Sequence, residues 1–194
     1  MFGGYEESWY CGKVKNDIRT EPPENLLEAK SLIGLISDTH DNVEAVRKAV
    51  EIFNQRKVSL VLHAGDYVAP FTARFYRELE APLKGVFGNV DGDRELLKKR
   101  FSEVGGEILG DFAVVEAGSL KIALLHGVDE RIVEALMLSG KYRVVVRGHT
   151  HKAETRKIGE TLMVNPGEAC GYLSGKRTIA LLNPEDLNVE FVEF

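Results

Sequence analysis

Side chains that bind metal ions recur at the ends of apolar runs in this sequence. Four of its five histidines, two aspartates and one asparagine follow such runs within a few residues. These seven candidate ligands are Asp38, His40, Asp66, Asn89, His126, His149 and His151. If the runs are strands of an open α/β sheet, their carboxyl ends face one crevice, which is where such sheets bind ligands. We therefore expect these scattered residues to meet in one site.

The spacing of the candidate ligands indicates metal chemistry. Asp38 and His40 are two positions apart, as are His149 and His151, so in extended backbone both side chains of each pair point the same way. Glycine directly precedes Asp66, as it does the asparagine, which allows close backbone approach in a tight turn. Carboxylate, amide and imidazole ligands without thiolate suit Mn²⁺, Fe, Zn²⁺ or Ni²⁺. Seven ligands exceed the need of one ion, so we expect two ions that share a carboxylate.

Alternating strands and helices are expected to position these ligands. Apolar runs typical of buried strands occupy residues 31–37, 58–63 and 83–87, and helices are predicted at 42–56, from Pro70 onward, and at 94–101. Residues 112–117 and 120–125 flank a Gly-Ser turn, which predicts a hairpin. A helix at 130–138 and short strands at 143–147, 153–158, 161–164, 178–182 and 189–194 follow. We predict an α/β fold, a four-layer α/β/β/α sandwich of two mixed sheets with helices outside.

The first 30 residues lack this alternation of strand and helix patterns. They contain Gly3-Gly4 and Pro22-Pro23 and show no apolar period. We expect residues 1–30 to be an N-terminal extension and residues 31–194 to be one domain. The aromatic residues Tyr5, Trp9 and Tyr10 offer a surface for docking on the core or on a partner subunit, which leaves a homodimer open.

The composition is that of a globular protein with a mild acidic excess. The 194 residues include 25 Lys+Arg against 30 Asp+Glu, for a net charge of −5, and 44% are hydrophobic. These values exclude a disordered tail, a collagen-like fibre and a coiled-coil rod. Broad nucleic-acid binding needs a basic surface, which is lacking. No segment approaches the roughly 20 apolar residues of a membrane helix, and the two cysteines, Cys11 and Cys170, form no CxxC motif, so we expect a cytoplasmic protein.

The order of the motifs resembles that of a known family. Asp38-x-His40, Gly65-Asp66, Gly88-Asn89, His126 and Gly148-His149-Thr150-His151 are similar to the calcineurin-like metallophosphoesterases, and above all to their small stand-alone microbial phosphodiesterases. The resemblance covers about residue 31 to the C-terminus and implies the four-layer fold. It implies that Asp38, His40 and His151 hold one metal ion. It implies that Asn89, His126 and His149 hold the other, and that Asp66 bridges both.

The resemblance implies a dinuclear metal-dependent phosphodiesterase. Two divalent ions, two carboxylates and one hydroxide leave about one net positive charge, which would bind a phosphate oxyanion. Ions roughly 3.5–4 Å apart lower the pKa of a bridging water, and the hydroxide attacks phosphorus in line. We expect Mn²⁺ or Ni²⁺, with Zn²⁺, Fe or Co²⁺ as alternatives, and a small phosphate ester, nucleotides included, as the substrate. The alternative is a catalytically weak metal-binding scaffold for protein–protein interaction.

One position departs from the family pattern. In many members a histidine follows the Gly-Asn pair and helps the leaving group depart, whereas this sequence has Val90 there. Valine donates no proton, so we expect a preference for good leaving groups, such as aryl or nucleotide diesters, over alkyl monoesters. The same departure lends some weight to the scaffold alternative.

Several other residues admit two interpretations. Asp91 either orients a ligand imidazole or caps the helix that begins near Asp93. Asn165 either lines the substrate side of the crevice or belongs to a simple β-turn, which we favour. His63 is expected in the core or behind the ligands, and Cys170 as a small buried residue. Gly171–Arg177 imitates a P-loop, but it is one residue short and has arginine where Ser or Thr must meet Mg²⁺.

Overall fold

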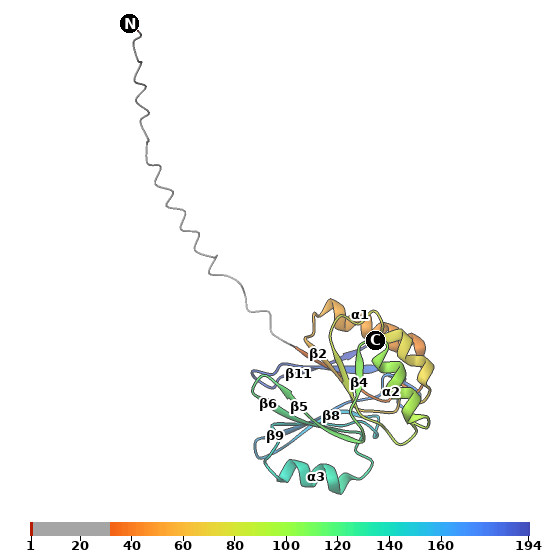
Figure 1. The fold of residues 1–194 in the computed structure, drawn as a ribbon. Coiled ribbons are helices and arrows are strands. Elements are labelled where there is room, and N and C mark those ends of the chain that lie inside the picture. The colour runs from red at the N-terminus through yellow and green to blue at the C-terminus, as the bar shows by residue number, and fades with distance from the viewer. Residues whose placement is uncertain (2–31) are drawn as a thin grey trace.

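The computed structural model describes Met1 and residues 32–194, which fold into two β-sheets packed face to face between outer helices (Figure 1). The predicted role of residues 1–30 therefore lies outside the described residues. The four-layer prediction for the remainder is confirmed. Within the described residues, no helix is long and apolar enough to cross a membrane.

The first sheet has a parallel centre with an antiparallel edge. Its strands run in the order β11-β10-β1-β2-β3-β4. Their bounds are β1 Ile33–Ile36, β2 Leu60–His63, β3 Leu83–Gly85, β4 Gly106–Ile108, β10 Thr178–Leu182 and β11 Val189–Glu193. Strands β1 to β4 pair in parallel, and β10 and β11 add antiparallel. Strands β1, β2 and β3 therefore all end at the same edge of the sheet.

The second sheet also mixes parallel and antiparallel pairs. Its order is β5-β6-β7-β9-β8, with bounds β5 Phe112–Ala117, β6 Leu120–Leu125, β7 Val144–Val146, β8 Ala153–Ile158 and β9 Thr161–Pro166. The predicted hairpin is the antiparallel pair β5 and β6. Strands β6, β7 and β9 are parallel to one another, so their carboxyl ends also meet at one edge.

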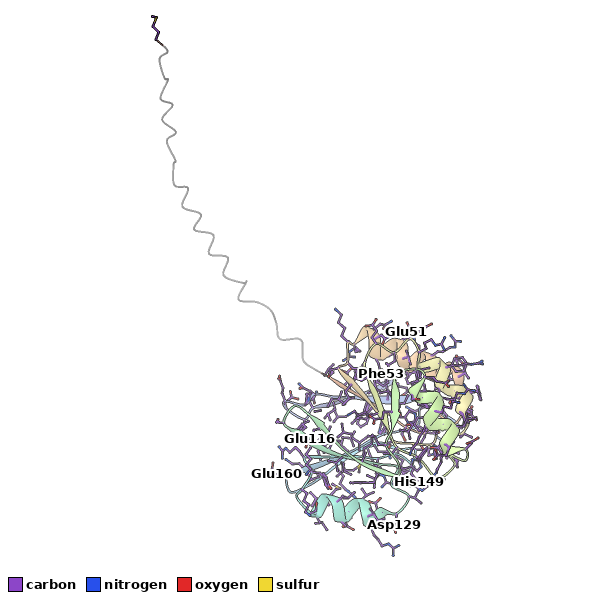
Figure 2. All side chains as sticks on the ribbon, viewed as in Figure 1. Glu51, Phe53, Glu116, Asp129, His149 and Glu160 are labelled. Atoms are coloured by element: carbon purple, nitrogen blue, oxygen red, sulfur yellow. The ribbon has the colours of Figure 1, made fainter. Side chains whose placement is uncertain are left out.

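Three apolar cores hold the four layers together. Alternate residues of a strand point to opposite faces, so Leu35 packs between the two sheets while its neighbour Ile36 packs under the outer helices. Phe53, labelled in Figure 2, belongs to the same outer core as Ile36. The third core lies between the second sheet and a single helix. Burial of both faces explains why the central strands are continuous apolar runs.

The helices cover the outer faces of both sheets. Helix α1 (Val43–Gln55), the 3₁₀ helix η1 (Pro70–Tyr76) and helix α2 (Arg94–Ser102) cover the first sheet, and α3 (Glu130–Leu138) covers the second (Figure 1). Asn42 caps α1, because its side chain accepts a hydrogen bond from the backbone N–H of Ala45. The segment after Pro70 is a 3₁₀ helix, and the short edge strand β4 was not predicted.

Candidate metal centre

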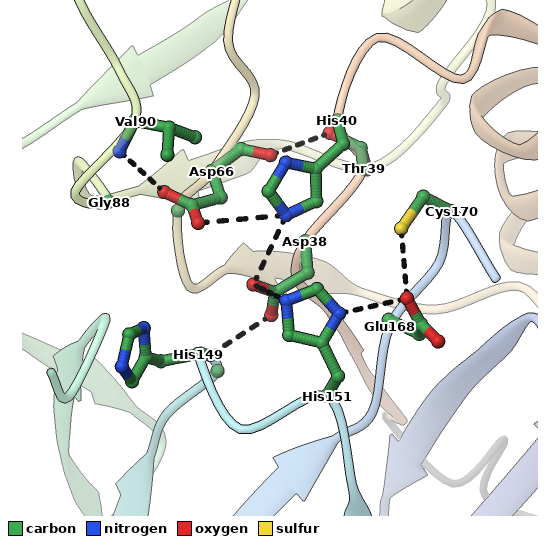
Figure 3. A network of polar contacts seen from close by, with 12 residues as sticks. Asp38, Thr39, His40, Asp66, Gly88, Val90, His149, His151, Glu168 and Cys170 are labelled. Atoms are coloured by element: carbon green, nitrogen blue, oxygen red, sulfur yellow. Dashed lines mark hydrogen bonds and ion pairs between the residues drawn. The ribbon is translucent and has the colours of Figure 1, made fainter. Parts of the chain in front are cut away.

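All seven predicted ligands lie at the edge where the parallel strands of both sheets end. Asp38 and His40 follow β1, Asp66 follows β2, and Asn89 follows β3. The remaining ligands come from the second sheet, where His126 follows β6 and His149 and His151 follow β7. Figure 3 shows that the side chains of Asp38, His40, Asp66 and His151 point toward one another. The topology thus gathers residues that are more than 100 positions apart in the chain.

One group of ligands surrounds Asp38. Its Oδ1 atom lies 3.7 Å from His40 Nε2 and 3.3 Å from His151 Nε2. The two imidazole rings stack with their centroids 5.3 Å apart. His40 Nε2 also lies 3.6 Å from Asp66 Oδ2, so Asp66 closes this group. A carboxylate faced by two imidazole nitrogens and a second carboxylate is a donor set suited to one divalent transition-metal ion.

The second group surrounds His126. Its Nε2 atom lies 3.2 Å from Asp66 Oδ2 and 3.0 Å from Asn89 Oδ1. The His149 ring meets the His126 ring edge-on, with 5.1 Å between centroids. Asp66 Oδ2 therefore faces both His40 and His126 and occupies the position of a bridge between two ion sites. This placement agrees with the ligand partition that the family resemblance implies.

The hydrogen bonds behind the histidines aim their lone pairs into the site. His126 Nδ1 lies 2.8 Å from the carbonyl oxygen of Ala64, and a carbonyl only accepts, so Nδ1 carries the proton. His151 Nδ1 lies 2.8 Å from the Glu168 carboxylate and donates for the same reason. In a neutral ring the Nε2 lone pair then faces a carboxylate oxygen, an arrangement that repels unless a cation lies between. The residues present therefore fit divalent cations.

Two buried atoms of the site support the same fit. Asp38 Oδ1 and His40 Nε2 are buried and have no hydrogen-bond partner. A buried polar atom without a partner is costly and calls for an explanation, such as a metal ion. The ligand atoms of Asp38, Asp66 and His126 also lie within 4.8 Å of one another, close enough to hold a metal ion.

The carboxylates attract protons to the histidines as they would attract a metal ion. The Asp38 carboxylate next to its ring raises the pKa of His40, although burial opposes this. Burial also disfavours a charged His126, but the hydrogen bond to Asp66 and the nearby carboxylates outweigh it and raise its pKa. Burial and the neighbouring His126 lower the pKa of His149. The site thus holds a concentrated negative charge that either protons or metal ions can neutralise.

Most ligands sit on left-handed backbone. The φ angles are 55° at Asp38, 40° at His40, 60° at Asp66, 70° at His149 and 60° at His151. Aspartate and histidine enter this region more readily than most residues, but it remains uncommon and costs free energy. Such outliers cluster at binding sites, where the surrounding structure holds them. The sharp turns let two ligands leave one strand end with both side chains aimed inward.

Glycine is required where two ligand loops come closest. A Cβ atom at Gly88 would overlap the Asp66 carboxylate, and a Cβ at Gly148 would overlap Ser37 Oγ and crowd Asp38 Oδ2. The prediction that the glycine before Asn89 permits close approach is therefore confirmed. At Gly148 the absence of a side chain lets the two sheets meet across the site.

Asp91 organises the backbone of the ligand loops. Its carboxylate accepts hydrogen bonds from the backbone N–H groups of Asp66 at 3.1 Å, Val68 at 2.8 Å and Gly88 at 2.7 Å. The capping alternative is wrong, because the carboxylate of Asp93 caps α2 instead. The hydrogen bonds of Asp91 also go to backbone groups rather than to a ligand imidazole. It supports Asp66 from behind through the main chain.

Asn165 braces the loop that carries His149 and His151. It is buried at the end of β9, and its amide nitrogen donates to the Gly148 carbonyl at 3.0 Å and to Thr150 Oγ1 at 2.8 Å. Its carbonyl accepts from the Gly167 N–H, as in the predicted turn. Because it is fully buried, it does not line the substrate side of the crevice.

His63 lies in the core, as predicted. The ring is fully buried and stacks on Tyr67 with centroids 3.8 Å apart. Its Nδ1 accepts a hydrogen bond from the Gly65 N–H at 3.1 Å, which shapes the turn before Asp66. Burial lowers its pKa well below the ordinary value, so it remains neutral.

Glu168 is a buried acidic residue of the site that sequence reasoning missed. Its carboxylate accepts hydrogen bonds from His151 Nδ1 and from Cys170 Sγ at 3.1 Å (Figure 3). It also accepts from the backbone N–H groups of Leu173 and Ser174. Burial opposes its charge, but the hydrogen bonds from Ser174 and His151 lower its pKa to about 2. The available signal was an acidic residue two positions past the end of a strand. Glu168 fixes the orientation of a ligand histidine.

Arg147 links the two histidine loops of the second sheet. Its buried guanidinium donates to the carbonyls of Gly127 and Gly148, and it forms an ion pair with Glu130 at the start of α3. The backbone following His126 and the backbone preceding His149 are thereby tied to one side chain. Sequence reasoning did not assign this role.

The remaining sequence features are structural. Cys170 is buried as predicted, and burial together with the Glu168 carboxylate raises the pKa of its thiol to about 12, so it remains protonated. The segment Gly171–Arg177 forms no P-loop, since it leads into β10 rather than into a helix. Its Leu173 and Ser174 N–H groups hold Glu168.

A four-layer sandwich with aspartate, asparagine and histidine ligands at five strand ends is the arrangement of a metal-dependent phosphoesterase. The sequence model of the calcineurin-like phosphoesterase superfamily domain matches residues 32–187. The chain therefore belongs to the calcineurin-like phosphoesterase superfamily, which confirms the resemblance drawn from the motifs.

Archaeal proteins are among the relatives. The chain is 42% identical over 154 residues to a phosphodiesterase of Methanocaldococcus jannaschii. The alignment covers 79% of this chain and 93% of the relative. It is 33% identical over 146 residues to a probable metallophosphoesterase of Methanothermobacter thermautotrophicus, covering 70% of this chain and 76% of the relative. The solved structure of an archaeal phosphodiesterase superposes with a TM-score of 0.81 at 38% identity, covering 84% of this chain and 99% of that chain.

Proposed function

We propose that the protein is a phosphodiesterase that works with two divalent metal ions. The observation that carries this proposal is the pair of imidazole lone pairs aimed at carboxylate oxygens, His151 Nε2 at Asp38 Oδ1 and His126 Nε2 at Asp66 Oδ2. Asp38, His40 and His151 would hold one ion. Asn89, His126 and His149 would hold the other, and Asp66 would bridge both. Mn²⁺ or Ni²⁺ suits these ligands, and Zn²⁺, Fe or Co²⁺ also binds such sets.

The bound ions would supply the nucleophile and the charge. Two divalent ions bridged by a carboxylate lower the pKa of a water molecule between them and stabilise an in-line displacement at phosphorus. The chain's own task is to hold the ligands rigidly. Asp66 is fixed by the Val90 N–H, which donates to its Oδ1 at 3.1 Å and leaves Oδ2 free for the ions. His151 is fixed by Glu168, and His126 by the Ala64 carbonyl.

Val90 limits the substrates that this site can process. Its side chain is 42% exposed beside the ligand loop and cannot donate a proton. The leaving oxygen must therefore depart without a proton from this position. Departure as an anion is easy for aryl groups and hard for simple alkyl groups, so aryl diesters are the favoured substrates, and alkyl monoesters are poor ones.

The scaffold alternative is not favoured. The seven candidate ligands lie at one edge of the two sheets, and the relatives with more than 30% identity are phosphoesterases by name, which supports an enzyme. A protein that only bound partners would have no need of the left-handed backbone at five ligands.

The experiment is a comparison of Asp66→Asn with wild type. Purified protein is loaded with Mn²⁺, its metal content is measured by elemental analysis, and hydrolysis of a diaryl phosphodiester is followed. We expect two ions per wild-type chain, a loss of metal in the variant, and a fall in turnover of at least about a hundredfold. Asp186→Asn is the matched control, because Asp186 is exposed and is separated in sequence from all candidate ligands. Full metal binding by wild type without turnover would overturn the proposal and support a scaffold.

A further inference from the structure

A cavity of about 650 Å³ opens directly beside the metal centre. Asn89 and His126, two proposed metal ligands, form part of its wall, as does Gly127. Its opposite wall comes from helix α3 and from the edge of the second sheet. The volume lies within the range of small-molecule binding sites, roughly 300–1,000 Å³. The cavity and the metal centre are therefore continuous.

The walls away from the metal ligands are mostly apolar. They are formed mainly by Phe87, Phe112, Val128, Ile132, Leu136 and Tyr142. Ile132 and Leu136 are one helical turn apart on α3 and share a face of it, whereas Val133 and Met137 of the same helix are buried against the sheet. Phe112, Val128 and Ile132 are large apolar side chains left exposed. Exposed apolar groups that line one concave surface mark a binding site.

One end of the cavity is polar and aromatic. Arg94 forms an ion pair with Asp111 at 2.8 Å, and its guanidinium lies 4.7 Å from the centre of the Phe87 ring. All three residues line the cavity. A planar guanidinium over a ring, next to a carboxylate, offers a flat surface and hydrogen-bonding groups to a planar partner. The combination favours an aromatic group over a flexible alkyl chain.

We propose that this cavity is the subsite for an aromatic group carried by the substrate. The inference rests on the proposed function: a phosphodiester held at the ions beside Asn89 and His126 directs one of its two organic groups into the cavity. The apolar wall on α3 covers the faces of a ring, and the Arg94–Asp111 pair contacts its polar edge. An aryl group and a nucleobase share this chemistry. The metal ions select the phosphate, and the cavity selects what the phosphate carries.

The test measures binding of phosphonates, which are not hydrolysed, to the metal-loaded full-length protein. Calorimetry gives the affinities of phenylphosphonate, of the adenosine 5′-methylenephosphonate and of methylphosphonate. We expect both aromatic probes, or one of them, to bind about tenfold or more tightly than methylphosphonate. A preference for the phenyl probe identifies an aryl subsite, and a preference for the adenosine probe identifies a nucleobase subsite. Equal affinity of all three would overturn the inference.

Substitutions on α3 test whether the preference for aromatic probes arises in this cavity. Ile132 is 54% exposed and lines the cavity, while Leu138 is 65% exposed on the same helix outside it. Ile132→Asn removes part of the apolar wall, and Ile132→Trp fills the space. We expect each to reduce the ratio of aromatic to methyl affinity about tenfold. Leu138→Asn and Leu138→Trp, the matched controls, should leave the ratio at the wild-type value. A ratio unaffected by both Ile132 variants would place aromatic binding elsewhere and overturn the inference.

Failure of this inference is distinguishable from failure of the proposed function. If diesters are hydrolysed but aromatic and methyl phosphonates bind equally, the subsite is refuted and the phosphodiesterase stands. If aromatic phosphonates bind selectively but no diester is hydrolysed, the subsite stands and the phosphodiesterase is refuted.

Discussion

Replacing Glu168 by glutamine should weaken one metal site without touching a ligand. The wild-type carboxylate accepts on both oxygens. The Ser174 N–H donates to Oε1, the Leu173 N–H donates to both oxygens, and His151 and Cys170 donate to Oε2. An amide has a single acceptor oxygen, so Glu168→Gln must turn its NH₂ group toward one pair of donors. The change is nearly isosteric, and its effect is therefore one of hydrogen bonding rather than of packing.

Both amide orientations are unfavourable. If NH₂ faces His151, the ring must move its proton from Nδ1 to Nε2, which removes the lone pair that binds the ion. If NH₂ faces the loop, the Ser174 N–H loses its acceptor, at a cost of about 1–3 kcal/mol, while the Leu173 N–H keeps its bond to the other oxygen, and the loop that holds residue 168 is displaced. Loss of a carboxylate behind a ligand histidine typically costs about 10- to 100-fold in metal affinity. We expect a loss of that size in Glu168→Gln.

Metal titration by calorimetry measures this loss. Because His151 belongs to one ion site, the affinity of one ion should fall more than that of the other, and excess metal should restore activity. Glu154→Gln, at an exposed position on β8, is the control and should titrate as wild type does. Unchanged affinity for both ions in Glu168→Gln would refute the role assigned to this residue.

The same residue predicts a pH effect on the metal-free protein. The pKa of Glu168 is about 2 in the folded chain against an ordinary value of 4.5. Because the folded value is the lower one, its stabilising contribution is present above pH 4.5 and is lost as the pH falls toward 2. The Tm of wild type, followed by circular dichroism, should therefore fall more steeply over this window than that of Glu168→Gln. Parallel curves would contradict the expectation.

Three further predictions concern the ligand loops. Gly88→Ala places a Cβ against the Asp66 carboxylate and should abolish tight metal binding, whereas Gly92→Ala, which meets nothing within 4 Å, should bind metal normally by elemental analysis. The neighbouring Asp38 carboxylate raises the pKa of His40, so protons compete with metal ions for this ring. Metal content after dialysis should therefore fall as the pH is lowered through the histidine range, and full retention at pH 4 would contradict histidine ligation. Val90→His should raise kcat for alkyl esters more than for aryl diesters, because it adds a proton donor; an equal change in both would show that protonation of the leaving group is not limiting.

The fold was predictable where a whole strand is buried, because its sequence is then apolar throughout. Strands β1 and β2 are buried on both faces, so they appear in the sequence as uninterrupted apolar runs. Strand β4 has three residues with an exposed Glu107 in the middle, which is too short for any pattern to emerge. The helix start at Pro70 was predicted from the proline, but the sequence carried no sign that the following turns would be 3₁₀.

The convergence of the candidate ligands was predictable because each stands near the end of an element that the sequence reveals. Asp38 and Asp66 directly follow apolar strands, and parallel strands end at a common edge. The roles of Glu168 and Arg147 were not predicted, because they depend on contacts between elements that are distant in the sequence. Glu168 meets His151 only after β8 and β9 have folded back between them, and Arg147 meets Gly127 only because β6 and β7 pair in parallel. No local spacing encodes either contact.

The candidate metal centre combines uncommon backbone conformations with unpartnered buried atoms, and this has a consequence for folding. Left-handed φ angles at five of the candidate ligands and the unpartnered Asp38 Oδ1 oppose the folded state. Residues next to the candidate ligands, Tyr67 and Phe87 in one core and Ala64 in another, anchor these loops in the apolar cores. Metal ions bind the arrangement that the cores enforce and an unfolded chain lacks, so their binding free energy adds to the stability of the folded state. The ligand loops, rather than the sheets, should therefore gain most of the protection from hydrogen exchange when metal is added.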